Sequence, residues 1–397
     1  MTQIKQTEAQ MIKHIHSSGI GRSLISFIAA ILAMAMLISC SGSVLDGANS
    51  TEDELRIVGT IGEYEVCYDE LYYLIMACSS IMANKYGEDI WKTEESAAKY
   101  ESELRENVLE RITSNYAVLL LCEEYGIKNI LTDRDAVKYV NKQIDSVLYA
   151  IAISNGIEVT FKESSSGKIK YNYPGDGLSR TTAIFDKMLA EEHLTERVMR
   201  LTLGVEFAFE QLSGVLTGEK GEIIFSAEDI EDYMFSDKFI ATRHIFIQND
   251  KGDSIEENRR IAEDLLAQHQ NGEPMDKLLG SKYNEDVSMT SALGYYFTYG
   301  EMDKTYEDAA FALKVGEVSD VIETEDGFFI IERLEKSSTY MLGNLEEFAN
   351  QITYALINQK VRDFQDSLSL TLSEFGSSVE FYKIPLNEVA SDEKNNK

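Results

Sequence analysis

The segment LGYYFTYGEM (residues 293–302) decides the fold of this chain, together with three shorter segments that follow it. These segments read YEDAAFAL (306–313), VGEVS (315–319) and TEDGFFII (324–331). From Ala241 onward, short strand-like runs alternate with helical stretches, and this alternation ends after Lys336. The change of pattern predicts a separate domain over residues 239–337.

The order and spacing of these segments resemble the parvulin family of peptidyl-prolyl isomerases (rotamases). The opening strand ATRHIFI (residues 241–247) and the loop KYNED (282–286) fit the same family pattern. The resemblance implies a four-stranded antiparallel sheet wrapped by helices. It also implies prolyl isomerisation, a reaction that breaks no covalent bond and whose barrier of about 18–20 kcal/mol comes from amide resonance. We therefore expect neither a metal nor an organic cofactor.

Three polar residues of the site follow from the family resemblance. His244 corresponds to the family's first histidine, on the opening strand. Asp286 corresponds to the cysteine or aspartate near the substrate carbonyl, and Thr324 to a threonine of the histidine network. The resemblance implies that these three residues form the catalytic group.

An apolar pocket for the substrate proline is implied in the same way. Its residues would be Leu293, Met302, Tyr306 and Phe329. Tyr306 stands where the family usually has phenylalanine, so it keeps the ring and adds a hydroxyl. Without the family resemblance, ordinary core packing would be the simpler interpretation of these residues.

Phe329 is the main departure from the family pattern, because highly active members carry a second histidine there, paired with the first. We therefore expect His244 to lack its imidazole partner. The run SALG (residues 291–294) also departs from the usual G-G-D-L-G sequence. Two interpretations stay open, an active isomerase and a domain that binds proline-containing chains without catalysis.

The flanking segments predict a second, mostly helical part of an α+β protein. A short strand pair is expected at residues 56–66, long helical stretches dominate the rest of residues 56–238, and an amphipathic helix begins at Leu345. A lone helix cannot bury its apolar stripe, so residues 338–385 should pack back on the N-terminal helical part. The parvulin-like domain is then an insertion. Residues 379–384 are expected to form a strand, and the tail at 386–397 to be disordered.

The N-terminus has the features of a secretory signal. The apolar run from Leu24 to Ile38 is shorter than the roughly 20 residues of a membrane-spanning helix. It ends in LISC (residues 37–40), which resembles a bacterial lipobox. This predicts cleavage after residue 39, a lipid anchor with acyl chains such as palmitate on Cys40, and a flexible tether over 40–55. An uncleaved anchor helix is the alternative, and both interpretations place the rest of the chain outside the cytoplasmic membrane.

Charge and cysteine content limit the remaining classes. The formal net charge of −31 repels phosphate backbones, which argues against nucleic-acid binding. Cys67, Cys78 and Cys122 are odd in number, so they form no closed disulfide framework, and none has a partner at a zinc-site spacing.

The order of signal, helical part, inserted parvulin-like domain and returning helix is similar to the PrsA foldase lipoproteins, and more distantly to the SurA chaperones. The resemblance implies a lipid-anchored, extracytoplasmic foldase whose partners are unfolded exported polypeptides. A holdase chaperone with an inactive parvulin domain and an envelope protein-interaction lipoprotein are the alternatives. Whether the chain acts alone or as a homodimer stays open.

Overall fold

The computed structural model describes residues 43–45, 51–127, 130–164, 169–223, 226–249, 254–286, 293–324 and 326–395. The predicted signal segment and Cys40 lie outside these residues. Among the helices within these ranges, none is both long enough and apolar enough to cross a bilayer. The described residues divide into two compact units, the first with those up to 57, 67–73 and 122–211, the second with those in 58–66, 74–121 and from 212 onward.

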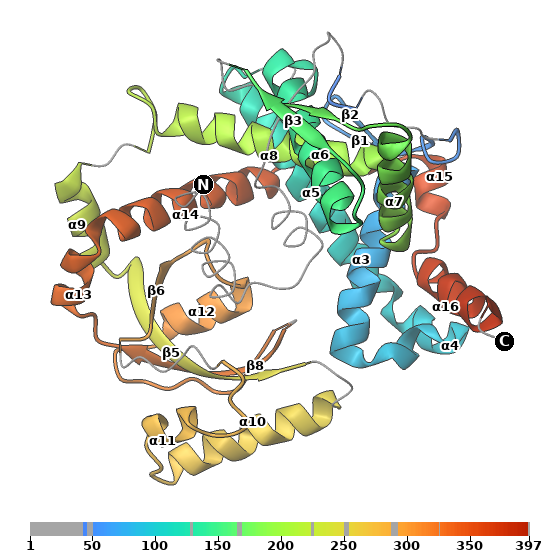
Figure 1. Cartoon of the computed structure of the whole chain (residues 1–397). Helices are drawn as coiled ribbons and strands as arrows, with labels where there is room; N and C mark the ends of the chain where they lie inside the picture. The colour runs from blue at the N-terminus through green and yellow to red at the C-terminus, as the bar shows by residue number, and fades with distance from the viewer. Residues whose placement is uncertain are drawn as a thin grey trace. The chain divides into compact units, whose positions relative to one another are not determined.

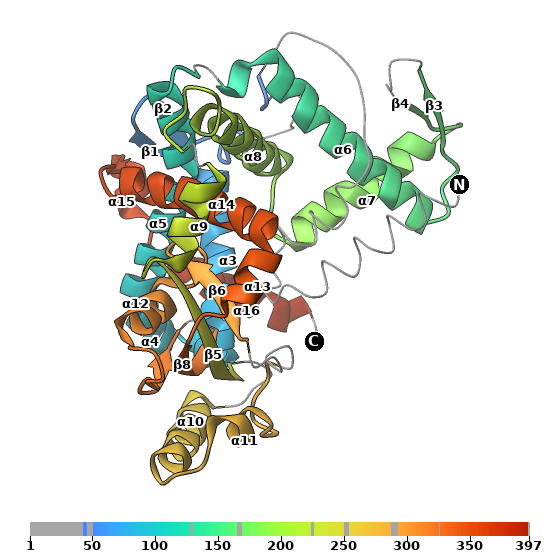
Figure 2. The ribbon, with the colours of Figure 1, turned by 90° about the vertical axis from the view of Figure 1, so that its left-hand side faces the viewer.

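The first unit contains a helical pair and a β-hairpin. Its elements are η3 (Ile130–Thr132), α6 (Arg134–Ser154), β3 (Thr160–Glu163), β4 (Ile169–Asn172) and α7 (Gly177–Glu191). Strands β3 and β4 pair antiparallel and form the hairpin. Tyr149 of α6 stacks on Tyr171 of β4 with ring centroids 4.7 Å apart, so the hairpin is fixed to the helix. Figure 2 shows the hairpin beside α6 and α7.

Three long helices have residues in both units: α3 (Tyr68–Tyr86), α5 (Glu101–Glu124) and α8 (Glu196–Leu216). The second unit contains most of β1 (Ile57–Ile61) and β2 (Tyr64–Cys67), together with η1 (Glu88–Trp91), α4 (Glu94–Ala97) and η2 (Ala98–Tyr100). Helix α9 (Ala227–Phe235) starts at a capping box, in which Ser226 and Asp229 satisfy each other's backbone N–H groups.

A four-stranded antiparallel sheet forms the part of the second unit that resembles parvulins. Its strands are β5 (Phe239–Gln248), β6 (Tyr295–Thr298), β7 (Ile322–Glu323) and β8 (Gly327–Leu334). The order is β6-β5-β8-β7, and every pairing is antiparallel. The predicted sheet is thus confirmed, with β5 at its centre.

Helices cover both faces of this sheet: α10 (Ile255–Gln270) and α11 (Met275–Leu279) on one, α12 (Lys304–Ala312) on the other (Figure 1). Because side chains alternate along a strand, odd positions of β5 such as Ile245 and Ile247 pack under α10 and α11. Even positions face α12, where Ile240 packs with Tyr306 and Ile331. His244 therefore lies on the α12 face.

The chain returns to its start through α13 (Ser338–Gly343), α14 (Leu345–Gln365), β9 (Thr371–Leu372), α15 (Glu374–Ser378) and α16 (Lys383–Asn395). Strand β9 adds to β1, with Gly59 opposite Leu372. The predicted return of the C-terminal segment to the N-terminal part is confirmed. The apolar stripe of α14 itself, with Phe348 and Ile352, packs against α9 and the β5–β6 end of the sheet.

Two expectations for the C-terminus were wrong. Residues 379–384 form no strand, because Phe381 is fully buried and the guanidinium of Arg105 lies 4.1 Å from its ring centre. Arg105 also donates to the carbonyl of Val379 at 2.7 Å, so this backbone group is used by a side chain instead of a neighbouring strand. The tail predicted to be disordered continues as helix α16 to Asn395.

Candidate active site

His244 lies in the middle of β5, in a small chamber of aromatic rings. Its side chain is 9% exposed. The ring of Tyr295 stacks on it at 5.6 Å, and the rings of Tyr306 and Phe329 approach edge-on at 5.4 and 5.0 Å. The imidazole is therefore held among apolar surfaces, where each hydrogen bond counts for more than in water.

Both nitrogens of the His244 ring have a partner. Nδ1 lies 2.9 Å from the hydroxyl of Tyr306, and Nε2 lies 3.0 Å from Oδ2 of Asp286. Position 329 offers no imidazole to His244, and the hydroxyl of Tyr306, on α12, lies within hydrogen-bonding distance of Nδ1 instead.

The hydrogen bonds continue beyond His244 on both sides. The Tyr306 hydroxyl lies 2.9 Å from Oγ1 of Thr242, and the Tyr295 hydroxyl donates to Oδ2 of Asp286 at 2.9 Å. Thr242 and Tyr295 face each other in the β5–β6 register. Thr242 was not predicted as a site residue, although its position two residues before His244 on the same strand face was a usable signal.

The proton positions follow from the chemistry of the partners. An ionised Asp286 can only accept, so Nε2 of His244 carries a proton. In the neutral ring Nδ1 then accepts from Tyr306, and Tyr306 accepts from Thr242. Burial raises the pKa of Tyr306, which opposes the lowering effect of the Thr242 hydrogen bond, so the phenol stays protonated. A protonated ring reverses the direction of the two bonds without breaking either.

Asp286 is positioned by hydrogen bonds between its loop and β5. The side-chain oxygen of Asn284 accepts from the backbone N–H of Phe246 at 2.9 Å, and its amide donates to the carbonyl of Leu279 at 3.0 Å. The backbone N–H of Glu285 donates to the carbonyl of Phe246 at 2.8 Å. These bonds place the next residue, Asp286, within hydrogen-bonding distance of His244.

An apolar wall adjoins this polar network. Met302 and Phe329 pack against the buried cluster that includes Phe297 and Tyr306. Leu293, the other predicted pocket residue, is 36% exposed. It precedes Gly294, whose φ of 68° and closeness to the carbonyl of Thr242 exclude a side chain at that position.

The loop that carries Met302 is held by one buried carboxylate. Oε1 of Glu307 accepts the backbone N–H groups of Gly300, Glu301 and Met302, each at 2.8 Å. Glu307 is 1% exposed. From α14, Arg362 donates to the carbonyl of Gly300 at 3.0 Å. The returning helix thus helps to position the apolar wall, which the sequence did not reveal.

Thr324 lies in the turn before β8, apart from this network. Its hydroxyl donates to the carbonyl of Gly327 at 3.3 Å and accepts from the N–H of Asp326 at 3.3 Å. Gly327 pairs with Gln248, four residues along β5 from His244, or about 13 Å at the rise of a strand. Both nitrogens of His244 are satisfied without Thr324.

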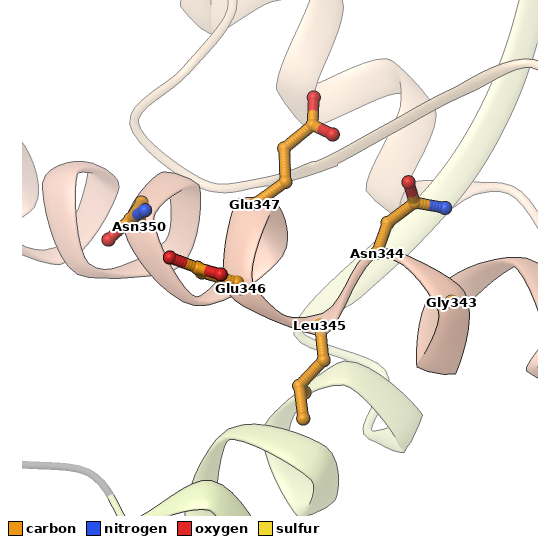
Figure 3. Close-up of a pocket in the computed structure, with 6 residues that line it drawn as sticks. All are labelled: Gly343, Asn344, Leu345, Glu346, Glu347 and Asn350. Atoms are coloured by element: carbon orange, nitrogen blue, oxygen red, sulfur yellow. The ribbon is translucent and has the colours of Figure 1, made fainter.

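A depression at the α13–α14 junction is unrelated to this site. It is lined by Gly343, Asn344, Leu345, Glu346, Glu347 and Asn350, and Leu345 and Glu347 point in opposite directions (Figure 3). Leu345 packs against the cluster formed by α9 and α14. No predicted site residue lines this depression, so the His244 chamber remains the candidate.

Comparison with known proteins agrees with this geometry. Residues 230–337 match the family described as the PPIC-type PPIase domain. The foldase protein PrsA of Caldanaerobacter subterraneus subsp. tengcongensis is 25% identical over 346 residues, which cover 85% of this chain and 90% of that protein. PrsA of Bacillus subtilis is 28% identical over 166 residues, 40% of this chain and about half (52%) of the relative's length.

The solved structure of the foldase protein PrsA from Streptococcus pneumoniae is 14% identical and aligns over 84% of this chain and 93% of that chain, with a TM-score of 0.29. The family match identifies residues 230–337 as a parvulin-type domain, and the chain is similar to PrsA foldase proteins along most of its length.

Proposed function

We propose that this chain is a peptidyl-prolyl isomerase that speeds the folding of exported proteins. The observation that carries the proposal is the His244 chamber, where a fully hydrogen-bonded imidazole adjoins an apolar wall containing Met302 and Phe329. The PrsA names of the relatives and the PPIC-type match support the same activity. The departure at Phe329 does not favour an inactive domain, because Tyr306 supplies the missing hydrogen bond.

The geometry supports catalysis by selective stabilisation of the twisted amide. An apolar wall takes the proline ring out of water, and the peptide then rotates about its C–N bond. Rotation removes amide resonance and changes the charge on the carbonyl oxygen and the nitrogen. Fixed dipoles that suit the twisted state better than either planar state lower the barrier. The Asp286–His244–Tyr306 network is such a set of fixed dipoles.

The test is cis/trans exchange of a proline peptide, measured by NMR with the whole chain. We expect exchange well above the uncatalysed rate, and a fall of at least about tenfold in kcat/KM for His244→Ala and for Met302→Ala, or about 1.4 kcal/mol of transition-state stabilisation. Lys314→Ala is the control, because that side chain is 86% exposed. A folded protein that leaves exchange at the uncatalysed rate would instead support the binding-only alternative.

We further propose that the chain works outside the cytoplasmic membrane, held there by lipid on Cys40. The apolar run before LISC (residues 37–40) supports this, as does the similarity to PrsA proteins along most of the chain. Its partners would be unfolded exported polypeptides. The net charge of −31 favours clients with basic segments and disfavours nucleic acids.

A further inference from the structure

We propose that Tyr306 is a positioning residue for His244, and that its hydroxyl does the work of the imidazole that Phe329 replaces. The inference rests on the proposed isomerase function and deepens it. It also changes the role of Tyr306, which the sequence placed in the substrate pocket. The structure gives the residue 3% exposure, and its hydroxyl is directed at His244 and Thr242.

The burial of the hydroxyl is the first step of the argument. A hydroxyl inside an apolar cluster costs free energy unless it is hydrogen-bonded. The Tyr306 hydroxyl has two partners, Nδ1 of His244 and Oγ1 of Thr242, both at 2.9 Å. A phenylalanine would fill the same cluster without that cost. The hydroxyl therefore adds nothing to packing, and its two hydrogen bonds are what it contributes.

The setting of Phe329 is the second step. Its ring stacks on Phe246 at 4.4 Å and meets the rings of His244 and Tyr306 edge-on at 5.0 and 5.2 Å. A phenyl ring has no hydrogen-bonding atom, so Phe329 cannot compete with the Tyr306 hydroxyl for Nδ1. Phenylalanine at 329 and a hydroxyl at 306 thus form a compensating pair.

The consequence for His244 is the third step. Asp286 holds Nε2 and Tyr306 holds Nδ1, so the plane of the ring and its neutral tautomer are both set. Thr242 lies on the same strand as His244 and anchors the phenol from the far side. The imidazole cannot rotate about its χ2 angle without breaking two hydrogen bonds.

The experiment compares Tyr306→Phe with the wild-type chain in two readouts. One is kcat/KM for the proline peptide, and the other is the ¹⁵N chemical shift of Nδ1 in protein labelled at histidine. We expect kcat/KM to fall about tenfold, mainly through kcat, and the Nδ1 signal to move as it loses its donor. Tyr340→Phe is the matched control, since that tyrosine lies on α13 and is 37% exposed. It should change neither readout.

The double variant Tyr306→Phe/Phe329→His tests the compensation. It should recover most of the lost activity, because an imidazole at 329 can again form a hydrogen bond with His244.

Wild-type kcat/KM and an unmoved Nδ1 signal in Tyr306→Phe would overturn the inference. Should Tyr306→Phe fail to fold, Thr242→Val removes the outer bond at nearly constant shape, and an unmoved Nδ1 signal there would count equally against it. An inactive wild-type chain contradicts the proposed function alone, because the Nδ1 signal still reports the Tyr306 bond.

Discussion

Glu301, one residue before Met302, is a buried carboxyl whose protonation affects the stability of the fold around the site. Burial raises the pKa of its carboxyl to about 7, against the hydrogen bonds from the Thr298 N–H and Gln351, and nearby Glu307 raises it further. The Thr298 N–H lies 2.7 Å from its Oε1, and the amide of Gln351, on α14, donates to its Oε2. A single carboxyl thus contacts both the sheet and the returning helix.

This pKa predicts a pH dependence of stability. A raised pKa means that the folded chain binds the proton more tightly than the unfolded chain, whose carboxyl titrates near 4.5. The stabilisation is fully present below about pH 4.5 and is lost as pH rises through about 7. From pH 5 to 8 the free energy of unfolding should fall by at most about 3 kcal/mol because of this group.

The measurement is urea unfolding at several pH values, with Glu301→Gln as the comparison. Glutamine keeps the size of the side chain and an acceptor for the Thr298 N–H, but it cannot ionise. The free energy of unfolding should change less with pH in the variant than in the wild-type protein. Parallel curves would show that another group sets the pH dependence.

At the scale of elements, the closure of the second unit depends on β1, β9 and α15. Thr60 faces Thr371 in the register of the two strands. Gly376 of α15 lies so close to β1 that an added Cβ would be 1.9 Å from the carbonyl oxygen of Val58. A glycine is required there because of the close approach of two backbones.

Gly376→Ala is therefore expected to destabilise the protein. The backbone of Val58 cannot move without disturbing β1, so a cost of about 1–3 kcal/mol is expected, as for other overpacked positions. Gly343→Ala is the matched control, because a Cβ there meets nothing within 4 Å. Midpoints of urea unfolding should fall for the first variant alone. A Gly376→Ala midpoint equal to that of the control would contradict this packing.

At the scale of the whole molecule, the parvulin-type domain depends on residues beyond it. Phe348 and Ile352 of α14 cover the β5–β6 end of the sheet, and Arg362 binds the loop that carries Met302. A fragment cut at residue 337 would expose this apolar surface. Measurements on the whole chain are therefore the informative ones.

The location of the whole molecule in the cell is predicted to depend on Cys40. Because a diacylglycerol chain would be the main attachment, Cys40→Ala should move the protein from the membrane fraction to the soluble fraction of the cell envelope or medium. Immunoblotting of fractionated cells checks this. Unchanged membrane association would indicate another anchor, such as an uncleaved N-terminal helix.

The sequence alone determined the parvulin sheet and the strand that carries His244. Those features depend on a local pattern, namely the alternation along β5. It also determined the discontinuous organisation, since the amphipathic stripe of 345–365 needed a partner. Its errors were the strand at 379–384 and the disordered tail at 386–397, where the chain forms helix α16 to Asn395.

Only the tertiary structure decided which group forms a hydrogen bond with Nδ1 of His244. Tyr306 is 62 residues away in sequence, and the direction of its hydroxyl depends on how α12 packs on the sheet. Arg362, on a helix that follows the domain, donates a hydrogen bond to the loop that carries Met302. Phe381 packs under the guanidinium of Arg105 and does not form part of a strand. A residue pattern records which side chains share a face of one element. It does not record where a polar atom of one element meets another, because that depends on the packing of the whole core.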